Sequence, residues 1–173
     1  MKKLSVHQRA SFLGDAVFAA SDGIVTTFAI VAGSEGASLG NSVVLILGFA
    51  NLFADGISMA AGRFLGVKSE IDFEEAKGRR TDVQVSPFKH AFLTFVFFNL
   101  AGLVPLIPFI FGQESSFVLS SFLVAIALIG VGVLKNVYTK NGVIKSIFEI
   151  LLVGGFAAIA AFFIGYVIEN YIL

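Results

Sequence analysis

The chain has 173 residues, of which 57% are hydrophobic, 14% are charged and 20 are Phe, and its mean hydropathy is +0.90. A soluble fold cannot cover that much apolar surface, so the composition excludes an ordinary soluble domain. The formal net charge is zero and cysteine is absent, which excludes a disulfide framework and a thiolate metal site.

Five apolar segments are long enough to cross a hydrocarbon core of roughly 30 Å as helices. We expect membrane spans near Asp15–Gly33, Val43–Leu65, His90–Phe111, Phe117–Leu134 and Ser146–Ile168. The sequence therefore predicts an all-α polytopic membrane protein, with residues 1–173 forming a single five-helix domain. A short cytoplasmic connection is expected at about residues 66–89, where the mixed charges of Ile71–Asp82 predict a solvated loop or helical turn.

Basic residues occur in only three parts of the sequence. All twelve Lys and Arg residues lie within 2–9, 63–89 and 135–145, whereas the loops at 34–42 and 112–116 contain none. In a five-span chain these three parts lie on one side of the membrane, and the positive-inside rule makes that side cytoplasmic. We therefore expect a cytoplasmic N-terminus and an external C-terminus.

Ionisable side chains inside the first two spans require an explanation, because a charge at the centre of a membrane helix costs roughly 2.5–3.5 kcal/mol on insertion scales. Asp22 lies near the middle of the first span, and Asp15 lies nearly two turns earlier, at its cytoplasmic end. Four residues spaced by four share one face of the second span: Asn51, Asp55, Met59 and Arg63. We expect this face of the helix to line a polar site or pathway inside the bundle.

These residue types indicate a metal pathway. A carboxylate oxygen opposite a thioether sulfur suits a borderline divalent ion such as Fe²⁺ better than Ca²⁺ or Mg²⁺, which favour shells of oxygen only. Carboxylates in a low-dielectric site also bind protons more tightly, so metal binding displaces protons there. The candidate metal residues are Asp22, Met59, Asp55, Asn51, Asp15 and Glu149.

Structural roles remain open for the same residues. Met59 taken alone is also typical of core packing, and Asp22 or Asp55 can join helices by hydrogen bonds. Glu149 begins the last span, where the helix dipole alone favours a carboxylate. His7 and His90 fall at the cytoplasmic interface without the spacing of a metal site, so we interpret both as interfacial residues.

The later spans contain packing signals. Pro105 and Pro108 lie in the outer half of the third span and are expected to bend or end it, which frees carbonyl groups that neighbouring helices must satisfy. Small residues recur around Gly56 in the second span and around Gly154 in the fifth. They allow helix backbones to approach closely in lipid.

Two motifs lie in the first two spans: Ser-Asp-Gly-Ile-Val-Thr-Thr-Phe-Ala at 21–29, and Gly-Ile-Ser-Met-Ala-Ala-Gly at 56–62 followed by Lys-Ser-Glu at 68–70. With these motifs the chain resembles the vacuolar iron transporter family, which includes the plant nodulin-21-like proteins. The resemblance implies a five-helix protomer, a homodimer with the pathway at its two-fold interface, and export of Fe²⁺, and often Mn²⁺, in exchange for protons. Under it, Asp22 and Met59 fall on the family's pathway carboxylate and methionine.

The chain departs from the well-studied members in two places. It lacks their long cytosolic metal-gathering domain, which brings it closer to the short nodulin-like members. It also has Asn51 where those members carry a carboxylate, eight residues before the methionine. We hypothesise that Asp55, one turn further along, supplies the missing charge.

We expect a transporter that exports Fe²⁺ or Mn²⁺ as its substrate, needs no cofactor and uses protons as the counter-ion. The alternative is a non-transporting scaffold or regulatory subunit. An enzyme is not favoured, because the spans contain no Ser/His pair, His cluster or nucleotide motif. We expect a homodimer without a nucleic-acid partner, in the cytoplasmic membrane of a bacterium or the vacuolar membrane of a eukaryote.

Overall fold

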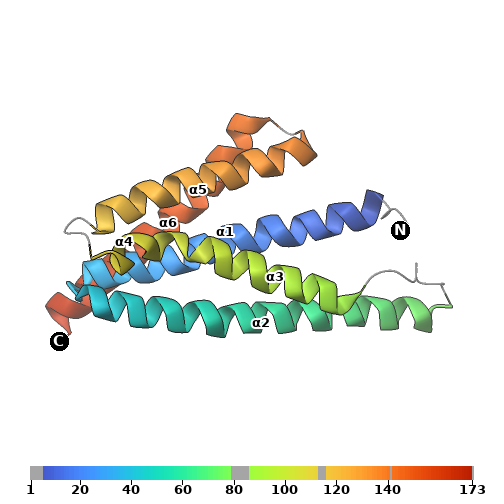
Figure 1. Cartoon of the computed structure of the whole chain (residues 1–173), viewed down its shortest axis with the longest axis horizontal. Helices are drawn as coiled ribbons and strands as arrows, with labels where there is room; N and C mark the ends of the chain where they lie inside the picture. The colour runs from blue at the N-terminus through green and yellow to red at the C-terminus, as the bar shows by residue number, and fades with distance from the viewer. Residues whose placement is uncertain (1–5, 79–85, 113–115, 141, 173) are drawn as a thin grey trace.

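Five long helices form an elongated bundle, with the two termini at opposite ends (Figure 1). The computed structural model describes residues 6–78, 86–112, 116–140 and 142–172. The elements are α1 (Val6–Gly36), α2 (Asn41–Ala76), α3 (Pro87–Gly102), the 3₁₀ turn η1 (Val104–Leu106), α4 (Ile107–Ile110), α5 (Ser116–Thr139) and α6 (Val143–Tyr171).

The predicted spans are confirmed as helices. Within the described residues, five segments are long and apolar enough to cross a membrane: Ala10–Gly36, Asn41–Ala76, Pro87–Ile110, Ser116–Val137 and Val143–Tyr171. The C-terminal end of α2, the N-terminal end of α3 and the α5–α6 connection lie at the same end of the bundle as the N-terminus of α1 (Figure 1). These parts carry the described basic side chains, and we call this end the basic end.

Helix α1 is the centre of the bundle. It contacts α2, α3, α5 and α6, with its most extensive contacts on α3 and α6. Two apolar clusters meet on it: Ala19 and Val31 pack in the cluster that contains Phe98 of α3, and Ile24 packs in the cluster that contains Leu128 of α5. The neighbours on both sides therefore fix the position of α1.

Glycines allow the backbones of α1, α3 and α6 to come into close contact. A Cβ atom at Gly23 would collide with the backbone carbonyl of Phe98 in α3, and one at Gly36 would collide with the carbonyl of Phe162 in α6. Small residues are favoured at helix contacts in lipid because dispersion and close packing replace the hydrophobic drive there. The packing of α1 against α3 and α6 therefore requires glycine at these two positions, because any larger side chain would collide with a backbone.

The two prolines break the third span as predicted. Helix α3 ends at Gly102, and Pro105 and Pro108 lie in the short η1 and α4 segments that follow. Their carbonyl groups accept hydrogen bonds from α5, where Ser120 Oγ donates to Pro105 O at 2.7 Å and Ser116 Oγ donates to Pro108 O at 3.4 Å. The neighbouring helix therefore satisfies the backbone groups that the break exposes.

Helix α2 is longer than the sequence pattern predicted. The predicted span ends at Leu65, whereas the helix continues to Ala76, so the first half of the predicted 66–89 connection is helical. The residues from Val67 to Ala76 include no Gly or Pro and several good helix formers, so helix propensity continues where hydropathy stops. Residues 79–85 of the connection lie outside the described residues, as do Lys2, Lys3 and Glu114 of the charge pattern.

The contact at Gly23 gives a first prediction. We expect Gly23→Ala to lower the free energy of unfolding by about 1–3 kcal/mol, because its new methyl group must push α1 away from α3. Thermal unfolding of the detergent-purified protein, followed by circular dichroism, measures this change.

Gly130→Ala in α5 is the matched control, because a Cβ there meets no atom within 4 Å in the described residues. That variant is expected to be neutral, or more stable by up to about 1 kcal/mol through its better helix propensity. Equal unfolding midpoints for the two variants would contradict the packing argument.

Candidate functional site: a cavity between the first three helices

A cavity of about 340 Å³ lies between α1, α2 and α3. Its lining consists of Asp15, Phe18 and Asp22 from α1, Met59, Gly62 and Arg63 from α2, and Thr94 from α3. In α1 the lining residues are three and four positions apart along the chain, so they lie on one face of the helix. In α2, Gly62 and Arg63 follow Met59 by three and four positions and share a face with it for the same reason. The cavity therefore brings together residues from three helices that are far apart in the sequence.

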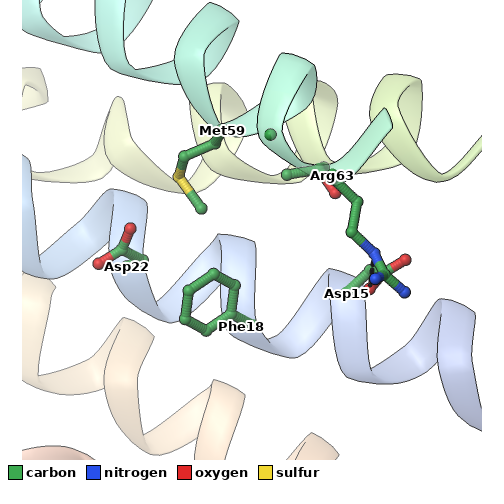
Figure 2. Close-up of a pocket in the computed structure, with 7 residues that line it drawn as sticks. Asp15, Phe18, Asp22, Met59 and Arg63 are labelled. Atoms are coloured by element: carbon green, nitrogen blue, oxygen red, sulfur yellow. Dashed lines mark ion pairs between the residues drawn. The ribbon is translucent and has the colours of Figure 1, made fainter. Parts of the chain in front are cut away.

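The central carboxylate and the thioether face the same space. Figure 2 shows the Met59 side chain reaching from α2 toward α1, where Asp22 and Phe18 lie. Met59 is partly buried and packs against the core cluster that contains Phe98. The cavity thus offers a hard oxygen ligand and a soft sulfur ligand within one protomer.

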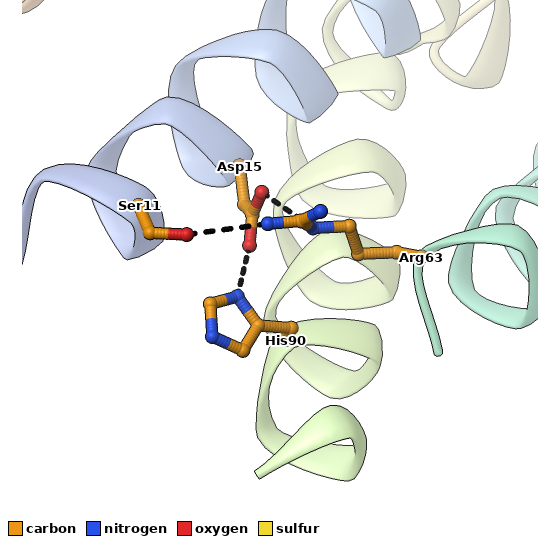
Figure 3. A network of polar contacts seen from close by, with 4 residues as sticks. All are labelled: Ser11, Asp15, Arg63 and His90. Atoms are coloured by element: carbon orange, nitrogen blue, oxygen red, sulfur yellow. Dashed lines mark hydrogen bonds and ion pairs between the residues drawn. The ribbon is translucent and has the colours of Figure 1, made fainter. Parts of the chain in front are cut away.

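Asp15 is held by an ionic cluster at the side of the cavity nearer the basic end (Figure 3). Arg63 Nε lies 2.7 Å from Asp15 Oδ1, and the other carboxylate oxygen is in contact with Nδ1 of His90. Arg63 also donates a hydrogen bond from Nη2 to Ser11 Oγ at 3.2 Å. The cluster joins α1, α2 and α3 and pairs both oxygens of Asp15.

His90 is a member of this cluster that the sequence analysis missed. We interpreted it as interfacial, but it is only 2% exposed, and its ring stacks on Phe12 with the ring centroids 4.1 Å apart. Thr94, which lines the cavity, follows His90 by one helical turn on α3 and is a second residue that the sequence pattern did not indicate. The four-residue spacing of the two was the available signal, since it places both on one face of the helix.

The remaining candidates lie outside this cavity. Asp55 and Asn51 are partly buried in α2 but are not part of its lining. Glu149 lines a second cavity of about 400 Å³ between α1, α5 and α6, whose lining also includes Asp22 and Phe18. There Glu149 Oε2 accepts a hydrogen bond from Lys135 Nζ at 2.9 Å. Asp22 is thus the one candidate carboxylate that lines both of these cavities.

The ligand set within one protomer is small. Among the described residues, no three His, Cys, Asp or Glu side chains lie close enough to hold a metal ion together. Asp15 and Glu149 are engaged by cationic side chains. Asp22 and Met59 are therefore the metal-ligating groups of the cavity that have no such competing cation.

These features describe an integral membrane protein with charged and thioether side chains on a cavity between its helices, and sequence comparison gives the family. The model of the VIT family matches residues 13–86 and 79–166. The chain is 33% identical to vacuolar iron transporter homolog 4 of Arabidopsis thaliana, over 90% of this chain and 83% of that protein. The chain belongs to the VIT family, which confirms the resemblance in its first two spans.

Two further relatives show how far the similarity extends. Vacuolar iron transporter 1 of Eucalyptus grandis is 27% identical over 92% of this chain and 89% of that protein. The vacuolar iron transporter of Toxoplasma gondii is 43% identical over 49% of this chain and 28% of that protein. The similarity therefore covers nearly the whole chain in the plant relatives.

The ionic cluster generates a second prediction. We expect Arg63→Gln to lower the free energy of unfolding by about 1–3 kcal/mol, because it leaves the largely buried Asp15 carboxylate without its cation. Lys135→Gln is the matched control, since the Lys135–Glu149 pair is more exposed, and exposed pairs contribute about 0–1 kcal/mol. Thermal unfolding of both variants in detergent measures the difference. A larger loss in Lys135→Gln would contradict the structural role of the cluster.

Proposed function

We propose that this protein transports a divalent metal ion, Fe²⁺ or Mn²⁺, across the membrane in exchange for protons. The observation that supports this most directly is the pairing of Asp22 and Met59 on one cavity inside the membrane-spanning part of the bundle. A carboxylate together with a thioether favours borderline transition metals over Ca²⁺ and Mg²⁺. The relatives are named as iron transporters or their homologues, which supports Fe²⁺ as the ion.

Proton coupling follows from the same carboxylate. A metal ion binds the deprotonated form of Asp22, so the ion and the proton compete for one group. If a proton takes the place of a departing ion, the carboxylate does not remain charged and empty within the membrane, where such a charge is costly. Exchange of metal for protons is the transport mode that this competition favours.

The direction of transport is proposed from the charge pattern. The described basic residues lie at one end of the bundle, and positive residues are retained on the cytoplasmic side of membranes. We therefore assign the basic end to the cytoplasm and the opposite end to the outside, or to the vacuolar lumen in a eukaryote. In this orientation the protein removes metal from the cytosol.

We further propose that the transporting unit is a homodimer. Divalent transition metals bind roughly four to six ligands, whereas the cavity of one protomer supplies Asp22 and Met59. A two-fold axis beside α1 would place a second carboxylate and a second thioether opposite the first pair. Phe18, which lies beside Asp22 and is 63% exposed, marks the open side of the cavity where the second copy would pack.

Asp55 has a supporting role in this proposal. It lies one helical turn from Met59 on α2, so a negative charge there raises the attraction of the cavity for a divalent cation without being part of the lining. This is consistent with the hypothesis that Asp55 supplies the charge that Asn51 lacks. Asp15 and Glu149 are assigned to their ion pairs with Arg63 and Lys135.

The transport proposal is tested by flux of Fe²⁺ and Mn²⁺ into proteoliposomes under an imposed proton gradient. Asp22→Asn is expected to abolish flux of both ions, since the amide keeps the shape of the side chain and removes its charge. Met59→Leu is expected to raise the KM for Fe²⁺ about tenfold, which corresponds to the loss of one contact of about 1.4 kcal/mol.

Glu169→Gln is the matched control, because Glu169 is an exposed carboxylate near the C-terminal end of α6. It is expected to transport like the wild type. Undiminished flux in Asp22→Asn would remove the central residue of the proposal. Absence of flux in well-folded wild-type protein would favour the scaffold alternative.

The dimer proposal can be tested by cross-linking, because the chain contains no cysteine. We expect Phe18→Cys in membranes to form a covalent dimer on treatment with a short bifunctional thiol reagent. Phe163→Cys is the control, since Phe163 is also 63% exposed but lies on α6, outside the linings of both cavities. Equal cross-linking of the two variants, or a monomeric mass in mild detergent, would contradict the proposed interface.

A further inference from the structure

Thr94 is a buried residue in the lining of the cavity that contains Asp22 and Met59. It lies in the middle of α3, is only 3% exposed and is the residue that α3 contributes to the cavity lining. Its Oγ1 atom is inaccessible to solvent and has no hydrogen-bond partner among the described residues. A buried hydroxyl group normally has such a partner, so this one needs an explanation.

Other hydroxyl groups in these helices show the usual arrangement. Thr26 Oγ1 donates to the carbonyl of Asp22 at 2.8 Å, and Ser121 Oγ donates to the carbonyl of Phe117 at 2.9 Å. Bonding to the carbonyl one turn earlier is the common solution for Ser and Thr inside helices. Thr94 does not use the equivalent carbonyl of His90, so a turn of its side chain about χ1 can direct the hydroxyl to an occupant of the cavity without breaking a hydrogen bond.

The chemistry of the cavity indicates what that occupant is. The lining combines the Asp22 carboxylate, the Met59 thioether and the Thr94 hydroxyl, which come from three different helices. A hydroxyl group can donate to one water molecule and accept from another, so it can hold the water shell of a cation without adding charge. Metal ions that enter a protein site retain such waters where the protein supplies few ligands.

We propose that Thr94 is a contact residue for the hydrated metal ion, with its hydroxyl group bound to a water of the ion's shell while Asp22 and Met59 bind the ion itself. This inference rests on the proposed transport function. It adds a third helix to the ion site. Because His90 lies one turn away on the same helix and contacts Asp15, α3 then connects the ion site to the ionic cluster.

The test compares Mn²⁺ binding by isothermal titration calorimetry in wild type, Thr94→Val, Thr94→Ser and Thr27→Val. Thr94→Val is expected to weaken binding about tenfold, and Thr94→Ser is expected to stay within about twofold of wild type because it keeps the hydroxyl. Without metal, Thr94→Val should unfold no earlier than wild type, since it removes a buried hydroxyl that has no partner in the described structure.

Thr27→Val is the matched control. Thr27 is fully buried, and its hydroxyl likewise has no partner among the described residues, but it does not line the cavity. It should bind Mn²⁺ like the wild type. If Thr94→Val does not fold, Thr94→Ala takes its place, with the same tenfold expectation.

The outcomes separate this inference from the transport proposal. Wild-type binding that Thr94→Val leaves unchanged would overturn the role of Thr94 and leave the transport function standing. Equal losses in Thr94→Ser and Thr94→Val would also overturn it, because the hydroxyl would then not matter. Absence of Mn²⁺ and Fe²⁺ binding in wild type would overturn the transport proposal, and the role of Thr94 with it.

Discussion

The close backbone contact of α1 with α3 and α6 is the constraint on which the cavity depends. Lipid provides little drive for apolar helices to associate, so close packing at small residues must supply it. Gly23 directly follows Asp22, and its contact with Phe98 fixes which side of α1 faces α3. Because successive residues of a helix turn by about 100°, Asp22 is directed away from Phe98 and into the cavity.

The sequence predicted the spans well because hydropathy and the positions of basic residues report directly on the bilayer. It also predicted the break at Pro105 and Pro108, since proline chemistry is local. The predicted second span ends at Leu65, whereas α2 continues to Ala76, because hydropathy ends where the hydrocarbon ends and a helix ends where its backbone hydrogen bonding ends. These two boundaries need not coincide.

The candidate site was only partly predictable. Asp22 could be identified because a charge is unusual inside a membrane helix, and Met59 because it shares one helical face with Asp55 and Arg63. The pairing of Asp15 with His90 could not be predicted, because it depends on how α3 is rotated about its own axis relative to α1. Helix α3 is apolar on nearly all sides, and the four-residue spacing of His90 and Thr94 shows that the two share a face but not which helix that face meets. Thr94 was missed for the same reason.

The length of α2 has a mechanical consequence. Its 36 residues span about 54 Å, well beyond a hydrocarbon core of about 30 Å, and its last turns carry four exposed carboxylates: Glu70, Asp72, Glu74 and Glu75. Glu74 and Met59 are separated by about 22 Å on one continuous helix. These acidic groups and the thioether therefore belong to one continuous helix. A tilt of the whole helix that starts at its end outside the membrane would move the carboxylates and Met59 together.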